Sequence, residues 1–250
     1  MSASSSVLIA GTEFRLMSRE WAPMVFAFAF PALLMLILAG VFGTEATPEY
    51  GGVTPATYYV ADYVAVPLGA LSLIGLPVMI ASYHERSILR RFEAAGVPSV
   101  AVIGAQALVT WVMVLLGVVV VLAVAAPIYG VPEVHDIGNV LVGFLLGSAT
   151  MIGLGVVLGL LAGTARSAQA LGMLAFFPMW LLGAGGPPRP VMPDVMATIA
   201  AFLPLGHVAA AIREPWLGTG SSVDNLLALG VWLAVVMVLG PLMLGLRRRR

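Results

Sequence analysis

The feature that most constrains this chain is a series of apolar segments, each about as long as a helix must be to cross a lipid bilayer. A spanning helix needs about 20 mostly apolar residues for the ~30 Å hydrocarbon core. Uninterrupted apolar runs predict helices, because the strands of a membrane barrel would alternate apolar and polar residues. We therefore predict an all-α integral membrane protein in which residues 1–250 form a single transmembrane domain. The six expected spans cover residues 23–42, 59–81, 100–126, 137–163, 168–184 and 226–246.

Composition agrees with this fold class and excludes several kinds of chemistry. Hydrophobic residues make up 60% of the chain and charged residues 10%, whereas a soluble domain carries about 25% charged residues. All 12 basic residues are arginine, and there is no cysteine. Without lysine, the chain can form neither a P-loop nor a Schiff base. Without cysteine, it can form no disulfide or thiolate site.

The distribution of arginine predicts how the spans are oriented. Six spans place both termini on one side, and most of the arginines fall in segments on that side. By the positive-inside rule, this side is cytoplasmic. We therefore expect a multi-pass protein of the cell (inner) membrane with both termini in the cytoplasm. The cytoplasmic group is Arg15, Arg19, Arg86, Arg90, Arg91, Arg166 and Arg247 to Arg250, and the outer group is Arg189 and Arg213.

No catalytic, cofactor-binding or metal site is predicted. His84, His135 and His207 lie in three different segments and lack the spacing of metal ligands, so we interpret them as surface or interface residues. Asp62, at the outer end of the second span, is the one charge near a span, and we expect it at the membrane surface. Ion-coupled carriers keep titratable residues at membrane depth. Such a mechanism therefore has little support in this sequence.

The inner segment 82–99 holds the densest charge in the chain. A helix over residues 85–95 would separate its apolar and charged side chains. Gly96 would cap this helix, and Pro98 would prevent its continuation. The residues alone leave two interpretations open, an interfacial helix or a docking element for a cytoplasmic partner. The apolar face would hold Ile88, Leu89, Phe92 and Ala95, and the charged face Arg86, Arg90 and Glu93.

Two further segments are expected to lie along the membrane rather than cross it. The stretch from Val7 to Trp21 mixes apolar and charged residues and predicts an N-terminal interfacial helix. The outer stretch from Val191 to Leu205 is apolar, but it is too short and too bounded by proline to span. We expect it to form a re-entrant or interfacial segment. The arginines that close the chain predict an anchor to lipid headgroups.

Glycines and aromatic residues mark particular spans. The fourth span carries glycines at multiples of four residues, which allow close helix packing. Aromatic side chains on the first and fifth spans could contact lipid, another subunit or an amphiphilic substrate. The glycines are Gly143, Gly147, Gly155, Gly159 and Gly163, and the candidate substrate-path residues are Phe26, Phe30, Phe176, Phe177 and Trp180.

The inner segment resembles the cytoplasmic loop of type-2 ABC transporter permeases, the membrane subunits of daunorubicin-resistance-like exporters. The matching residues are Glu85-Arg86, Leu89-Arg90-Arg91 and Gly96-Val97-Pro98. A second similarity, before the last span, comprises Leu203-Pro204-Leu205 and Ala211-Ile212-Arg213. Chain length, six spans and a long loop between the fifth and sixth spans also match.

The resemblance implies a permease subunit of an ATP-driven exporter of amphiphilic or lipid-like compounds or drugs. Two membrane subunits, identical or sister chains, would pair, and separate ATPase subunits holding ATP and Mg would dock on the inner loop. No cofactor or nucleic acid would bind this chain. A partner-independent secondary carrier and a membrane scaffold without transport are the alternatives. The implied coupling residues are Glu85, Arg86, Leu89, Arg90, Arg91, Phe92, Gly96 and Pro98.

Overall fold

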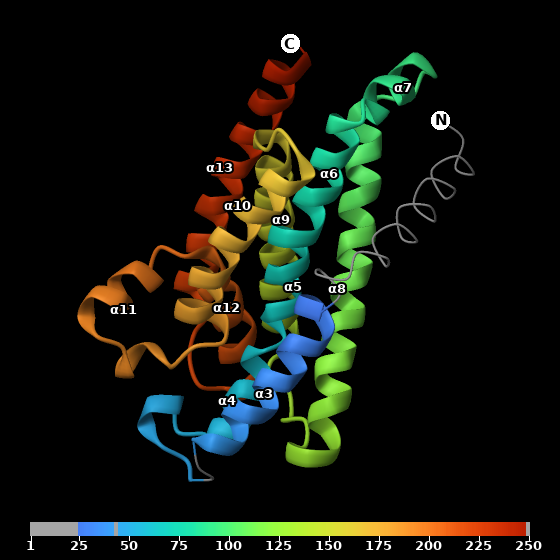
Figure 1. The fold of residues 1–250 in the computed structure, drawn as a ribbon. Coiled ribbons are helices and arrows are strands. Elements are labelled where there is room, and N and C mark those ends of the chain that lie inside the picture. The colour runs from blue at the N-terminus through green and yellow to red at the C-terminus, as the bar shows by residue number, and fades with distance from the viewer. Residues whose placement is uncertain (1–24, 43–44, 249–250) are drawn as a thin grey trace.

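The structure is a computed structural model that describes residues 25–42 and 45–248. These residues form an elongated bundle of helices, and no strand occurs among them (Figure 1). The short helix α7 (Ile88–Ala94) lies at one end of the bundle, and α4 (Pro55–Asp62) lies toward the opposite end. We call these the α7 end and the α4 end. The predicted interfacial helix from Val7 to Trp21 lies outside the described residues.

Five helical segments in the described part of the chain are long and apolar enough to cross a membrane. Each overlaps one of the predicted spans, from the second to the sixth. In the first predicted span, the described part consists of the π-turn η1 (Val25–Ala29) followed directly by α3 (Phe30–Val41), which has 12 residues. The five segments are Pro48–Glu85, Ser99–Tyr129 (α8), Ile137–Leu161 (α9), Ala165–Ala184 and Val223–Gly245, the last within α13 (Val223–Arg248).

The second span is the central helix of the bundle and is divided into pieces. It comprises α4, α5 (Ala65–Ala70), the π-turn η3 (Leu71–Gly75) and α6 (Leu76–Glu85). Pro77 falls at the second position of α6, directly after the π-turn. Proline lacks an amide donor, so its place after a change of helical register leaves fewer amides without a partner. Pro77 therefore lies within the second span without ending it.

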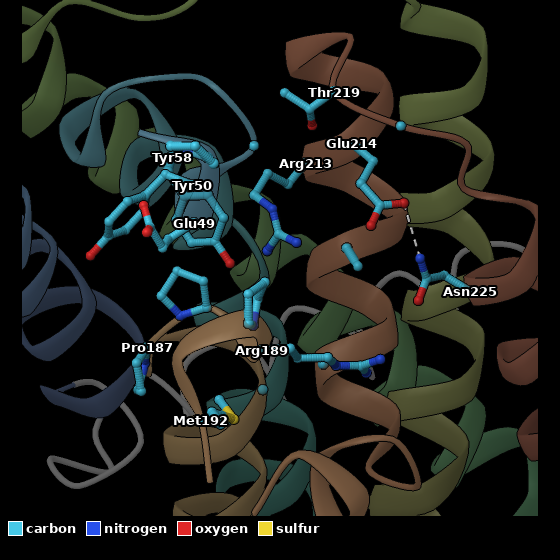
Figure 2. Close-up of a pocket in the computed structure, with 18 of the residues that line it drawn as sticks. Glu49, Tyr50, Tyr58, Pro187, Arg189, Met192, Arg213, Glu214, Thr219 and Asn225 are labelled. Carbon is cyan, nitrogen blue, oxygen red and sulfur yellow. Dashed lines mark hydrogen bonds between the residues drawn. The ribbon is translucent and has the colours of Figure 1, made fainter. Parts of the chain in front are cut away.

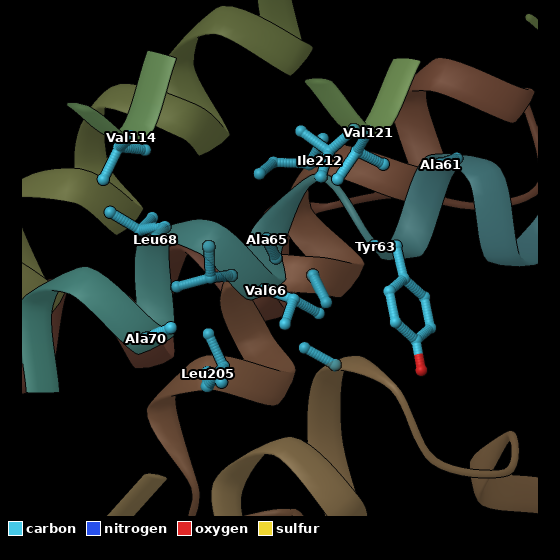
Figure 3. Packing of buried hydrophobic residues seen from close by; sticks show 14 of the residues in the cluster. Ala61, Tyr63, Ala65, Val66, Leu68, Ala70, Val114, Val121, Leu205 and Ile212 are labelled. Atoms are coloured by element: carbon cyan, nitrogen blue, oxygen red, sulfur yellow. The ribbon is translucent and has the colours of Figure 1, made fainter. Parts of the chain in front are cut away.

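The main apolar core surrounds α5. Leu68 of α5 lies beside Val114 of α8, and Leu205 and Ile212 of α12 (Pro204–Leu217) belong to the same cluster (Figure 3). All four side chains are buried. A helix enclosed in this way must be apolar on every face, and its sequence, Ala-Val-Pro-Leu-Gly-Ala, has no polar side chain.

The glycines of α9 allow other helices to approach its backbone closely. A Cβ on Gly155 would lie 2.0 Å from the carbonyl oxygen of Ser72 in η3, and one on Gly143 would lie 2.5 Å from that of Ala211 in α12. Gly172 of α10 (Ala165–Met179) meets η3 from a second side, with its Cβ position 2.0 Å from the Leu73 carbonyl oxygen. The predicted role in helix packing is confirmed for four of the five glycines, whereas the fifth follows α9 and has nothing within 4 Å of an added Cβ: the four are Gly143, Gly147, Gly155 and Gly159, and the fifth is Gly163.

The outer segment after α10 differs from the expectation. A π-turn, η4 (Trp180–Ala184), extends α10 and is followed by two helices, α11 (Asp194–Ala200) and α12, which meet at a bend of 84°. We predicted the inserted segment over 191–205, but the deeply buried helix is α12, which packs against α4, α9, α13 and η4. Pro204 begins α12 at a position where its missing amide hydrogen needs no partner. His207, which we interpreted as a surface or interface residue, is buried in α12 and contacts Asn225 and the Ala201 carbonyl oxygen.

Candidate functional site

The charged loop between the second and third spans forms a short helix of its own. We predicted one helix over 85–95, but α6 ends at Glu85 and α7 begins at Ile88. Ser87, between them, has φ 56°, and it is the one non-glycine residue with positive φ among those described. This conformation turns the chain and separates α7 from the end of the span.

The apolar side of α7 packs onto the hairpin formed by α6 and α8. Leu89 is 8% exposed and lies in a cluster with Tyr83 of α6 and Val102 of α8. Ile88 and Phe92 pack against the same cluster and are partly buried. Of the predicted coupling residues, Leu89 therefore holds α7 on the bundle, whereas the exposed ones are Glu85, Arg86, Arg90, Arg91, Gly96 and Pro98.

The far end of α7 is fixed by its cap. Gly96 has φ 81°, and its amide donates to the carbonyl oxygen of Glu93 at 2.9 Å, while the Val97 amide donates to that of Phe92 at 2.8 Å. This pair of bonds satisfies carbonyls that a helix end leaves open. Pro98 then forms the N-cap of α8, and the Ser99 hydroxyl donates to Glu93 Oε1 at 2.6 Å. The predicted cap by Gly96 is confirmed.

Glu85 connects the start of this loop to a different span. Its Oε2 atom accepts a hydrogen bond at 2.9 Å from the amide of Ala165, the first residue of α10. A carboxylate is favoured at a helix N-terminus, where unpaired amides and the helix dipole are positive. The loop is therefore attached to α8 through Glu93 and to α10 through Glu85.

Four of the five candidate substrate-path residues come together, because the rings of Phe176 and Phe177 also contact each other, with centroids 5.7 Å apart. The rings of Phe30 and Trp180 have centroids 4.9 Å apart, and those of Phe177 and Trp180 are 6.4 Å apart. Phe177 is partly exposed, whereas Phe176 is fully buried in the main core. The side chain of Phe26 lies outside the described part of the structure. The first and fifth spans thus share one aromatic cluster.

A buried ion pair lies at the α4 end, where the sequence suggested a surface aspartate. Asp62 is 1% exposed and accepts from the guanidinium of Arg213 in α12. That guanidinium also lies over the ring of Tyr58, 4.3 Å from its centroid. The expectation for Asp62 was wrong because the two residues are 151 positions apart, so their pairing depends on how α12 inserts. The sequence did contain one signal of this pairing. Arg213 carries the opposite charge, lies in another apolar stretch and was predicted on the same, outer side of the membrane as Asp62.

Arg213 also lines a pocket of about 480 Å³ at this end (Figure 2). Tyr50 and Tyr58 form one side, with ring centroids 5.2 Å apart, and Glu214 lies on the other, where it accepts from Asn225 Nδ2 at 3.0 Å. Such a pocket can hold a polar group against an aromatic wall. Its lining contains no nucleophile paired with a base. Further charged lining residues are Glu49, Arg189 and Asp224.

Comparison with known proteins decides the family. The family model described as ABC-2 type transporter matches residues 7–215, most of the chain. The chain belongs to the ABC-2 type transporter family. The matched region extends into α12 and contains the α7 loop, the aromatic cluster and the Asp62–Arg213 pair. A search of curated proteins and a search of solved structures gave no match.

ABC-2 proteins of this kind are membrane components of ABC transporters, and hydrolysis of ATP generally takes place on a separate subunit. This division of labour agrees with the sequence, because an ABC-2 chain without lysine cannot build a P-loop. In the part of the chain that the structure describes, no group of three His, Cys, Asp or Glu side chains could hold a metal ion. The ABC-2 membership of this chain therefore places its function in transport.

Proposed function

We propose that this chain is the membrane-spanning permease subunit of an ATP-driven exporter that moves an amphiphilic or lipid-like compound outward. One observation carries the proposal. A short charged helix, α7, is fixed to the bundle on one face and leaves Arg91 exposed on another, and Arg86 is exposed in the turn that precedes it. A helix that served only to lie on the membrane would direct its apolar face to lipid, whereas α7 uses that face to pack on α6 and α8.

The α7 end faces the cytoplasm in this proposal. Arg86, Arg90, Arg91 and Arg166 lie in the segments at this end, as the positive-inside rule requires of a cytoplasmic side. A separate ATPase subunit, holding ATP and Mg, docks on α7. A second permease chain, identical or sister, completes the membrane part.

Movement of α7 reaches the membrane through two connections. The Glu93–Ser99 bond joins it to α8, and the Glu85–Ala165 bond joins the preceding turn to α10. Through η4, α10 is continuous with Trp180, which lies in the aromatic cluster with Phe30 and Phe177. ATP-dependent displacement of α7 would thus shift one wall of this cluster against α3. We propose that the cluster contacts the apolar part of the cargo.

The test is co-purification of the ATPase with the natively expressed chain in mild detergent. Arg86→Gln together with Arg91→Gln should lower the amount of bound ATPase by about an order of magnitude, since one charged interface contact contributes up to a few kcal/mol. Arg166→Gln, which removes one exposed charge at the same end but outside α7, should leave binding unchanged. Equal ATPase recovery with all variants would contradict the docking site.

A partner-independent carrier is the second candidate, and the buried Asp62–Arg213 pair is the observation that favours it, because carriers use charges inside the membrane. The two functions differ in their energy source. The purified chain in sealed vesicles, without ATPase, should move no cargo if the exporter proposal holds. Uptake driven by an ion gradient under these conditions would establish the carrier instead.

A further inference from the structure

A second pocket lies beside α7, on the side of the helix that the docking proposal does not use. It has a volume of about 410 Å³ and is lined by residues of α6, α7, α8, α9 and α13. Arg90 and Glu93 of α7 are three residues apart and therefore lie on the same side of the helix. The lining residues are His84, Leu89, Arg90, Glu93, Ser99, Leu160 and Leu244.

The lining is divided into an apolar wall and a polar rim. Leu160, near the end of α9, and Leu244, near the end of α13, form the apolar wall with Leu89. Arg90 and His84 supply basic groups at the rim. The carboxylate of Glu93 is already hydrogen-bonded to the Ser99 hydroxyl at 2.6 Å, which holds that negative charge at the start of α8.

The position of the pocket points to a lipid. Both α8 and α13 pack against α9, and all three helices carry large exposed apolar side chains, among them Leu108, Leu145 and Leu242. These faces meet acyl chains in a bilayer, and they end at the level of the pocket. The surroundings are also basic, since Arg86, Arg91 and Arg166 lie in segments at this end.

We propose that this pocket binds the headgroup of an anionic phospholipid from the cytoplasmic leaflet, with Arg90 contacting the phosphodiester. Basic pockets between spans on the cytoplasmic side are suited to such headgroups. The bound lipid would lie between α7 and the ends of α9 and α13, and would hold α7 in position. The inference rests on the proposed orientation, but not on ATPase docking or export.

The test measures lipid retention by the full chain without its ATPase. The protein is delipidated in mild detergent, incubated with dioleoylphosphatidylglycerol or dioleoylphosphatidylcholine, and examined by native mass spectrometry. We expect one phosphatidylglycerol to remain bound and phosphatidylcholine to be lost. Arg90→Gln should weaken phosphatidylglycerol binding about fivefold, the contribution of one basic residue near an anionic headgroup. Arg91→Gln, on the next residue of α7 but not in the lining, should leave it unchanged.

A second variant leaves every charged residue unchanged and fills the volume of the pocket. Leu244→Trp fills the apolar wall and should abolish retention while ATPase co-purification persists, so the outcome is separate from that of the docking proposal. Equal loss in the Arg90 and Arg91 variants, equal retention of the two lipids, or full retention by Leu244→Trp would each overturn the site.

Discussion

Two charges taken out of water depend on each other more strongly than two charges at a surface. Asp62 is almost completely buried and Arg213 is largely buried, and Asp62 Oδ2 has no hydrogen-bond partner among the residues that the structure describes. Removal of one member of such a pair leaves the other charged, buried and uncompensated, which costs about 3–5 kcal/mol. The contact between α4 and α12 therefore requires both members of the pair.

We predict that Asp62→Asn lowers the stability of the purified protein by about 3–5 kcal/mol, measured as a lower midpoint of thermal aggregation in detergent. Glu133→Gln makes the same chemical change at an exposed position and should leave the midpoint unchanged. The double variant Asp62→Leu, Arg213→Met should recover most of the loss, since an apolar pair of similar size needs no compensation. A midpoint for Asp62→Asn equal to that of the control would show that the pair has no structural role.

Glu85 allows a second prediction for a single residue, because it lies at the helix start of α10 rather than on α7. Glu85→Ala should leave ATPase co-purification intact but lower ATP-driven transport about two- to fivefold, the effect of losing an anion at a helix N-terminus. Glu85→Gln retains an acceptor for the Ala165 amide and should fall between Ala and wild type. Loss of ATPase binding in Glu85→Ala would instead make Glu85 part of the docking surface.

Single elements of this bundle depend on close approach of backbones. Gly155 of α9 and Gly172 of α10 meet η3 at the successive carbonyl groups of Ser72 and Leu73. A π-turn carries backbone groups that regular helix geometry does not pair in the usual way, and here two glycines allow neighbouring helices to cover it. The central span can therefore be both broken and buried.

Gly172→Ala should destabilise the protein by about 1–3 kcal/mol, the usual cost of extra volume in a packed core, because its Cβ would lie 2.0 Å from a carbonyl oxygen. Gly104→Ala in α8 and Gly230→Ala in α13 are matched controls, with nothing within 4 Å of the added atom. These should raise stability by up to about 1 kcal/mol through helix propensity. Thermal midpoints in detergent measure all three, and a rise with Gly172→Ala would contradict the packing.

Sequence patterns predicted which segments form helices more accurately than they predicted where each helix begins and ends. Apolar runs of spanning length identified the five long segments, since length and hydropathy are local properties. The start of α7 was misplaced because Ser87 adopts positive φ, a conformation that serine does not signal. The insertion of α12 was missed in part because its buried face forms only when α4, α9 and α13 surround it. The Asp62–Arg213 pair was missed for the same reason.

The whole molecule is asymmetric along its long axis, and this asymmetry predicts its orientation. Arg90, Arg91 and Arg166 lie toward the α7 end, whereas acidic residues such as Glu133 and Asp136 lie toward the α4 end. Because the positive-inside rule counts basic residues in short loops, the two ends should differ in accessibility from outside an intact cell. The pocket at the α7 end should then open toward the cytoplasm, and the pocket at the α4 end toward the outside of the cell.

The absence of cysteine from the chain makes this orientation directly measurable. A single cysteine at Glu133 should react with a membrane-impermeant maleimide in intact cells, because this exposed residue precedes α9 at the α4 end. A single cysteine at Arg166, exposed near the start of α10, should react only after the membrane is permeabilised. The reverse pattern would place α7 outside, where no ATPase could reach it and no cytoplasmic lipid could enter the pocket beside it. Both proposals would then fail together, whereas the buried contacts of the bundle would be unaffected.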